Sequence, residues 1–401
     1  MEAEKIQDIV IAGAGYAGLH VALRLAARID VKQAAVRLTL VDKNPYHQVL
    51  TELPRVAAGT RVAQDVRVPL EPLLEGRVRF VQSAITGFDL NERQLLTQGD
   101  PVPYSRLVLA LGSQSQDFGI PGLSQHALPL WSVEDARRLL AAVDTQVAAA
   151  VRAADPAERR RCLTVGIGGG GATGVEVAGE LAEVLPELAR RHDLPTEECR
   201  VVLVEAGPTL LPGSSTGLIE RAGQILQELG VEVRTGTRVV QAEEDGYVLS
   251  MGEKLRCGVC VWCGGIKVAD VVAASPLSTG HGGRIPVDQY LRAMDHPEIY
   301  VAGDVALVMN TETGRALPPL AQIALEEGET VAHNLLAEVE GRPLEPFAFR
   351  DKGIVVSIGG SSGVASVVGH PFGGRLVHVL KDAIEWEYRQ SVKHLRGWSP
   401  I

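Results

Sequence analysis

The stretch that decides the fold is residues 9–18, IVIAGAGYAG. An apolar strand runs here into three glycines, and residues 19–29 continue as an Ala- and Leu-rich helical segment. Residues 36–41 form the next apolar strand, which ends on Asp42 followed by Lys43. Strand, glycine turn, helix, strand and acid make a βαβ unit that binds a dinucleotide, because the glycines let backbone approach a pyrophosphate and the acid binds a ribose.

The same order of elements recurs between residues 162 and 205, where the second strand ends on Glu205. The two glycine fingerprints start at Gly13 and Gly169, 156 residues apart. One such triplet is often a plain tight turn, whereas two copies in the same context favour a duplicated architecture with one nucleotide in each. Glu205 would repel a 2′-phosphate, so the second unit is expected to prefer NADH to NADPH. The alternative is a solvated Glu at a strand end.

The composition of the 401-residue chain excludes several classes of function. Its 39 Lys and Arg against 49 Asp and Glu give a net charge of −10, without the basic surplus of a nucleic-acid-binding protein. The length favours two or three domains. The longest uncharged run, residues 353–374, is too rich in Gly, Ser and Pro for a membrane span, and no secretory signal precedes residue 9. We expect no transmembrane helix.

Three of the five cysteines, Cys257, Cys260 and Cys263, have the spacing of metal ligands. The segment around them is strand-like, however, and no fourth ligand is nearby, so we interpret them as small buried residues and expect no metal site. Only Cys263, at the end of the strand, is expected to lie near a cofactor.

Two acids outside the fingerprints are further candidates. Glu176 lies in the first turn of the second unit's helix, where the dipole favours an acid. A second anion beside a pyrophosphate is unfavourable unless it points away, towards the domain interface, which predicts a functional role. In Ala302-Gly303-Asp304, the Gly lets a ligand approach and Asp304 could accept hydrogen bonds from a polyhydroxyl chain. The alternatives are a helix-stabilising Glu and an ordinary Asp at a strand end.

Several further segments are shared with one family of flavoproteins: Ala110-Leu-Gly112-Ser113, Phe118-Gly-Ile-Pro-Gly122, Gly174-Val-Glu-Val-Ala-Gly-Glu-Leu181, Pro318-Pro-Leu-Ala-Gln322 and Asp351-Lys-Gly353. With the two fingerprints, the chain resembles the type II NADH:quinone oxidoreductases (alternative NADH dehydrogenases) of the two-dinucleotide-binding-domain flavoprotein superfamily. The resemblance covers about residues 8–370.

The resemblance implies an α/β fold of two Rossmann-like domains and a small C-terminal domain. The FAD-binding domain is expected to comprise residues 1–115 and 285–345, and the NADH-binding domain residues 116–284. Residues 346–401 are expected to form strands and one amphipathic helix that docks on a membrane or forms a dimer.

The same resemblance implies the site residues. FAD is expected to contact Gly13, Gly15, Gly18, Asp42, Lys43, Ala110, Gly112, Asp304, Ala321 and Gln322. NADH is expected to contact Gly169, Gly171, Thr173, Gly174, Glu176, Glu205 and Gly265. Glu176, Lys352 and Gln322 are the expected catalytic residues, with Gln322 and Lys352 bordering the quinone.

Two features depart from the family pattern. Where relatives usually have a Gln-Gln pair, this chain has Glu326-Glu327, which changes the polarity expected at a quinone pocket. The last helix carries a single apolar stripe, formed by Val377, Leu380, Ile384, Tyr388, Val392 and Leu395, with Arg389, Lys393 and Arg396 beside it and Asp382, Glu385 and Glu387 interspersed. This stripe is either a peripheral membrane anchor or a face packed on the body or on a second copy.

The expected reaction is oxidation of NADH through FAD and reduction of a membrane quinone, without proton pumping, at the cytoplasmic side of the cell membrane. One alternative is a sulfide:quinone reductase or an NADH-dependent reductase of another acceptor. Another is an NADH-binding redox sensor with slow turnover.

Overall fold

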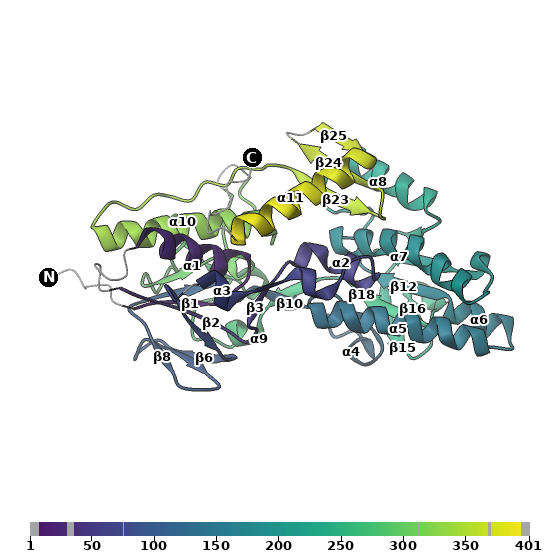
Figure 1. The fold of residues 1–401 in the computed structure, drawn as a ribbon, viewed down its shortest axis with the longest axis horizontal. Coiled ribbons are helices and arrows are strands. Elements are labelled where there is room, and N and C mark those ends of the chain that lie inside the picture. Colours follow the sequence, from purple (N-terminus) through teal and green to yellow (C-terminus); the bar gives the residue numbers. More distant parts are fainter. Residues whose placement is uncertain (1–7, 30–35, 75, 311–312, 368–369, 394–401) are drawn as a thin grey trace.

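The computed structural model of the chain describes residues 8–29, 36–74, 76–310, 313–367 and 370–393. Two five-stranded parallel sheets form its centre, one in each half of an elongated molecule (Figure 1). The first sheet has, in spatial order, β21 (Ile299–Val301), β9 (Arg106–Leu109), β1 (Asp8–Ala12), β2 (Arg37–Asp42) and β5 (Arg79–Gln82). The second has β11 (Leu128–Pro129), β18 (Val259–Trp262), β12 (Thr164–Gly168), β13 (Arg200–Val204) and β14 (Glu232–Arg234). The predicted α/β class is confirmed.

The central strand of each sheet is the apolar strand that leads into a glycine fingerprint. In the first sheet, β1 lies between β2 and β9, with Ile9 opposite both Leu38 and Arg106. In the second, β12 lies between β13 and β18. Residues 9–12 and 164–168 are buried throughout, because a central parallel strand is covered on both faces. Their carboxyl ends place both glycine turns at a sheet edge.

The helices pack around these sheets. The longer ones are α1 (Tyr16–Arg28), α5 (Val133–Arg152), α6 (Pro156–Cys162), α7 (Ala172–Arg191), α8 (Thr216–Glu228), α10 (Ala321–Glu340) and α11 (Arg375–Lys393). The short ones are α2 (Leu53–Ala57), α3 (Leu70–Leu74), α4 (Leu123–His126) and α9 (Asp270–Ala273). In Figure 1, α1 and α10 lie side by side over the first sheet, and α5 and α7 lie with the second.

Smaller sheets complete the two halves. They are β3 (Tyr46–Gln48) with β4 (Arg67–Pro69), β6 (Ile85–Asp89) with β7 (Gln94–Thr97) and β8 (Val102–Pro103), β15 (Val239–Glu243) with β16 (Gly246–Leu249) and β17 (Lys254–Arg256), and β20 (Ile285–Pro286) with β22 (Ala306–Leu307). One pair joins the halves: β10 (Ser113–Ser115) runs antiparallel to β19 (Ile266–Val268). Each large sheet draws its strands from one of the expected domains, but the exact boundaries stay a prediction.

The C-terminal region is an antiparallel sheet of β23 (Ile354–Ile358), β24 (Ser362–Val367) and β25 (His370–Gly373), followed by α11. This sheet packs on α7 and α8 of the second half (Figure 1). At the closest approach Gly179 of α7 faces Gly359, where a Cβ on Gly179 would lie 2.5 Å from the backbone nitrogen. From there α11 runs back towards the first half (Figure 1), and its side chains contact both halves, Tyr388 bonding to His47 and Lys381 pairing with Glu176 of α7.

Both glycine fingerprints hold the start of a helix against its own turn. A Cβ on Gly18 would lie 1.9 Å from the Gly13 carbonyl oxygen, and a Cβ on Gly174 1.8 Å from that of Gly169. Gly13 and Gly169 have φ of +103° and +110°, in the region that side chains rarely adopt. By contrast, no atom lies within 4 Å of a Cβ on Gly171 among the described residues.

These contacts predict that Gly174→Ala and Gly171→Ala behave differently. A methyl group at 174 cannot avoid a backbone oxygen, so we expect the free energy of unfolding to fall by about 3 kcal/mol, the upper end for overpacking. Gly171→Ala should keep nearly the wild-type stability in denaturant titrations. Equal losses in the two variants would contradict this explanation of the fingerprint.

Candidate functional site

We call the glycine turn of residues 13–18, together with the carboxyl ends of β1, β9 and β21 that meet beside it, the first cradle. A Cβ on Gly13 would lie 2.4 Å from the Ala110 carbonyl oxygen, so the glycine turn sits directly on the end of β9. Gly303, at the end of β21, has φ of +78° and faces the Cβ of Ala17 in α1. The structure therefore brings together three predicted segments that are up to 290 residues apart (Gly13 to Gly303).

Two predicted acids border this cradle. Asp42 accepts hydrogen bonds from the N–H groups of Ala14, at 2.7 Å, and Asn44, at 2.8 Å. Burial raises the pKa of Asp42, while these two hydrogen bonds oppose the rise. Asp304 accepts a hydrogen bond from the Ser113 hydroxyl, and burial raises its pKa as well. Both carboxylates thus face the edge at which the resemblance places the first cofactor.

The second cradle, the glycine turn of residues 169–174 with the carboxyl ends of β12, β13 and β18, repeats this arrangement in the other half. A Cβ on Gly169 would lie 2.5 Å from the carbonyl oxygen of Cys263, at the end of β18. Glu205 accepts hydrogen bonds from the N–H groups of Gly170, at 2.6 Å, and Gly207, at 2.5 Å. Thr173 is half-buried in the first turn of α7, and a Cβ on Gly265 would touch the ring of Phe118.

The cysteines near this cradle are shielded. Cys257 and Cys260 are buried, with their sulfurs 3.4 Å apart. Burial raises the pKa of the Cys263 thiol to about 12, so it is a protonated thiol at neutral pH. No group of side chains able to hold a metal ion occurs in the described part of the chain.

The start of α10 carries the third predicted cluster. Ala321 and Gln322 open the helix after Pro318-Pro319, and both are half-buried. Glu326 lies one turn further along and pairs with Lys352 at 3.1 Å. Because residues four apart share a helix face, Gln322, Glu326 and Lys352 form one polar group. That this group borders the flavin and the quinone stays a prediction.

The two acids that depart from the family pattern point in different directions. Glu326 faces Lys352 and is partly exposed, whereas Glu327 is fully buried. The Glu327 carboxylate accepts a hydrogen bond from the Gly303 N–H at 2.5 Å. The sequence predicts that both acids border a quinone pocket, whereas in the structure only Glu326 lies with Gln322 and Lys352, and Glu327 lies under the first cradle.

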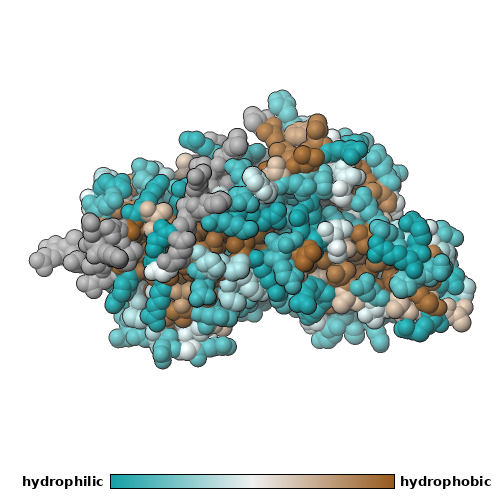
Figure 2. Space-filling view, viewed as in Figure 1, coloured by the Kyte–Doolittle hydropathy of each residue, from teal (hydrophilic) through white to brown (hydrophobic). Residues whose placement is uncertain are grey.

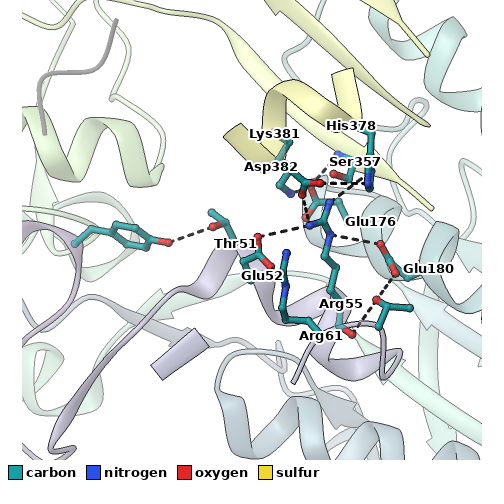
Figure 3. Close-up of polar contacts among 12 residues, drawn as sticks. Thr51, Glu52, Arg55, Arg61, Glu176, Glu180, Ser357, His378, Lys381 and Asp382 are labelled. Atoms are coloured by element: carbon teal, nitrogen blue, oxygen red, sulfur yellow. Dashed lines mark hydrogen bonds and ion pairs between the residues drawn. The ribbon is translucent and has the colours of Figure 1, made fainter. Parts of the chain in front are cut away.

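Glu176 faces the C-terminal region rather than solvent. It is buried, forms an ion pair with Lys381 of α11 and accepts a hydrogen bond from the Ser357 N–H of β23 at 3.1 Å (Figure 3). We expected this acid to point towards the domain interface; its partners in the structure belong to the C-terminal region. Its contact with NADH remains a prediction.

Arg55 of α2 organises the neighbouring charges, and sequence reasoning missed it. Its guanidinium lies 3.7 Å from Glu52, 3.8 Å from Glu180 of α7 and 2.5 Å from Asp382 of α11 (Figure 3). Burial raises the pKa of Glu180. Burial would also raise that of Asp382, but the hydrogen bond from Arg55 and its charge lower it. The local sequence offers only the nearby Glu52, and the other two partners come from distant segments, Glu180 of α7 and Asp382 of α11.

A second missed group links α11 to the first cradle. Burial lowers the pKa of His47 to about 4, so the imidazole is neutral. The Ala14 carbonyl can only accept, so Nδ1 of His47 donates to it at 2.8 Å. Nε2 then accepts from the Tyr388 hydroxyl, also at 2.8 Å. The last helix therefore supports the glycine turn itself.

The apolar stripe predicted on α11 packs inward. Val377, Tyr388 and Val392 are buried against the body, so of the two alternatives given for this stripe the structure has the packed face; Leu395 lies outside the described residues. α11 also has apolar residues on a second, outward face. Leu376, Val379 and Trp386 are 79%, 63% and 60% exposed. No helix within the described ranges is long and apolar enough to cross a membrane.

Two glycine cradles on separate parallel sheets, with an acid-bearing loop at each, define a two-dinucleotide oxidoreductase. The family model "Pyridine nucleotide-disulphide oxidoreductase" matches residues 7–328. The type II NADH:quinone oxidoreductase of Staphylococcus aureus (strain NCTC 8325 / PS 47) is 34% identical over 387 residues, 96% of this chain and 95% of that protein. The relative of the same name from Staphylococcus haemolyticus is 32% identical over the same shares.

Among solved structures, that of NDH2 from Plasmodium falciparum in complex with NADH has the same fold, with a TM-score of 0.84 at 18% identity, covering 95% of this chain and 94% of that one. The sulfide:quinone oxidoreductase from Aquifex aeolicus has a TM-score of 0.79 at 18% identity, covering 97% and 92%. The chain belongs to the type II NADH:quinone oxidoreductases.

The residues at the first cradle fit FAD. The glycine turn exposes backbone N–H groups at a helix N-terminus, which suits a pyrophosphate. Asp42 and Asp304 offer acceptors to hydroxyl groups. In the described residues, Arg284 Nε and Glu327 Oε1 are buried without hydrogen-bond partners beside Asp304, and such polar atoms are satisfied when a polar ligand binds.

The buried pair of Glu176 and Lys381 gives a prediction of stability. Lys381→Met leaves Glu176 buried without its cation, so we expect the free energy of unfolding to fall by about 3 kcal/mol. Adding Glu176→Gln should restore part of the loss. The control is Lys254→Met, which breaks an exposed pair with Glu243 and should change little. If denaturant titrations give the same result for both lysines, the pair is not structural.

Proposed function

We propose that the protein oxidises NADH and reduces a quinone through FAD bound in the first cradle. The net reaction is NADH + H⁺ + quinone → NAD⁺ + quinol. The observation that carries the proposal is the pair of glycine cradles, one bordered by Asp42 and Asp304 and the other by Glu205. When bound, FAD supplies the hydride acceptor and the two-electron donor. The protein's own groups bind, orient and manage protons.

The chain's residues divide these tasks. Glu205 accepts two backbone hydrogen bonds and adds a negative charge at the carboxyl edge of the second sheet. This charge suits ribose hydroxyls and disfavours a 2′-phosphate. Gln322 can donate to a quinone oxygen, and the Lys352 ammonium can stabilise negative charge that develops there. Glu176, buried between α7 and α11, is the proposed acid or base near the nicotinamide. These assignments rest on placement and on the family.

The alternative of a sulfide:quinone reductase is less well supported. That chemistry needs a reactive thiolate near the flavin. Burial raises the pKa of Cys263 to about 12. The hydrogen bond with Cys257 and, second to it, burial raise the pKa of Cys260. The likeness to the Aquifex aeolicus structure concerns the fold. A redox sensor with slow turnover would show rapid flavin reduction by NADH but no reoxidation by any quinone.

The outer face of α11 supports peripheral membrane attachment, which we also propose, at the cytoplasmic side of the cell membrane. Figure 2 shows apolar surface gathered over β24, β25 and the start of α11. The exposed apolar residues there are Val367, Phe372, Leu376, Val379 and Trp386. Arg375 and Lys393 are exposed at the two ends of the helix and suit anionic lipid. A homodimer through the same face is the competing arrangement.

The reaction is tested by separating its two halves under anaerobic conditions. NADH should bleach the flavin absorbance, NADPH should do so poorly, and a soluble quinone should restore it. Lys352→Met should slow the second step by about tenfold or more and leave the first unchanged. The control is Lys254→Met. Flavin that NADH reduces and quinone never reoxidises would refute the proposal.

Membrane attachment is tested with vesicles of phosphatidylethanolamine and phosphatidylglycerol. The triple variant Leu376→Ser, Val379→Ser, Trp386→Ser should lose binding by about tenfold or more in co-sedimentation, because each apolar side chain contributes on the order of 1 kcal/mol when buried. A matched triple variant at exposed apolar residues elsewhere, Val62→Ser, Val240→Ser and Met294→Ser, should bind as the wild type does. Unchanged binding in the first variant, with a change in oligomeric state, would favour the dimer.

A further inference from the structure

Glu327 is a buried acid that neither the fingerprints nor the proposed proton chemistry uses. It lies on the inner face of α10, with no exposed surface, and its Oε2 accepts the Gly303 N–H at 2.5 Å. In the part of the chain that the structure describes, its Oε1 has no hydrogen-bond partner. Gly303 is the residue before Asp304, so this carboxyl group supports the turn that presents Asp304 to the cofactor.

The charges around Glu327 do not favour a carboxylate there. Asp304 is a second acid at the same turn. Arg284 is the nearby cation, but its guanidinium donates to the Leu317 carbonyl at 2.8 Å and makes no hydrogen bond to Glu327 in the described structure. On α1, which packs along α10, His20 and Arg24 are paired with Glu329 instead.

We infer that Glu327 is a cofactor-positioning residue that acts as a neutral carboxylic acid beneath the first cradle, and that its ionisation loosens FAD. A neutral acid can accept from Gly303 through one oxygen and donate its proton through the other, as a Gln amide would. This explains how the chain can carry a Glu at a position where relatives usually have a Gln. The free Oε1 is the donor position left for FAD or for a water between them.

The electrostatics agree with this geometry. Burial raises the pKa of Glu327 to about 8, the hydrogen bond from Gly303 and the charge of Arg284 lower it, and Asp304 raises it further. The folded pKa lies above the unfolded value, so its contribution to stability is fully present below the unfolded pKa of about 4.5 and is lost as the pH rises through about 8. The negative charge of a bound FAD pyrophosphate would oppose ionisation of Glu327 as well.

The inference is tested by measuring FAD release from the holoenzyme, by ultrafiltration and flavin absorbance, between pH 6.5 and 9. If only the neutral form binds well, the apparent Kd of the wild type rises by up to about tenfold per pH unit above pH 8. Glu327→Gln should bind FAD with nearly the same Kd across this range. Glu326→Gln, the neighbouring acid that pairs with Lys352, should keep the pH dependence of the wild type.

Each outcome of this measurement decides the role of Glu327 in FAD binding, whatever the electron acceptor of the enzyme is. A flat Kd for the wild type up to pH 9 overturns the inference whatever the variants do. A rise that Glu327→Gln shares assigns the effect to another group and also overturns it. Since FAD binding alone is measured, failure here is separable from failure of quinone reduction.

Discussion

The contact on which the rest of the structure depends is the seating of a helix N-terminus on the carbonyl oxygen of its own glycine turn. It occurs twice, between Gly18 and Gly13 and between Gly174 and Gly169, where no Cβ can be accommodated. Each contact fixes the direction of a helix relative to its sheet and so aims a set of free N–H groups at one point. The acids at the two sheet edges can bind a cofactor only because the position of these N–H groups is fixed.

A second constraint joins the two halves. Buried charges on α2, α7 and α11 meet at Arg55 and at the pair of Glu176 and Lys381 (Figure 3). Buried ion pairs add little net stability, but removing one partner is costly, so they select one arrangement of the parts. The neutral His47 provides a similar link from Tyr388 to the glycine turn. Both links hold the cradles in a defined relation to the last helix.

The sequence predicted what is locally encoded. The glycine turns, their strands and the acids that end the next strands follow from residue type and spacing, and the structure has them in place. The partner of Glu176 could not be predicted, because Lys381 is 205 residues away. Glu326 and Glu327 look alike in sequence, yet a 100° turn of the helix sends one to Lys352 and the other into the core. The sequence left two alternatives for the stripe on α11, because two faces of that helix are apolar and residue type alone does not say which one packs on the body.

The double use of α11 limits how the chain can change. Its inner face contributes Lys381 and Tyr388 to the interior, while its outer face carries Leu376, Val379 and Trp386. A tail exchanged for that of another peripheral protein would therefore remove part of the scaffold around the first cradle, even if the new tail bound lipid equally well. In a chimera, the transferable unit is the outer row of side chains and not the helix.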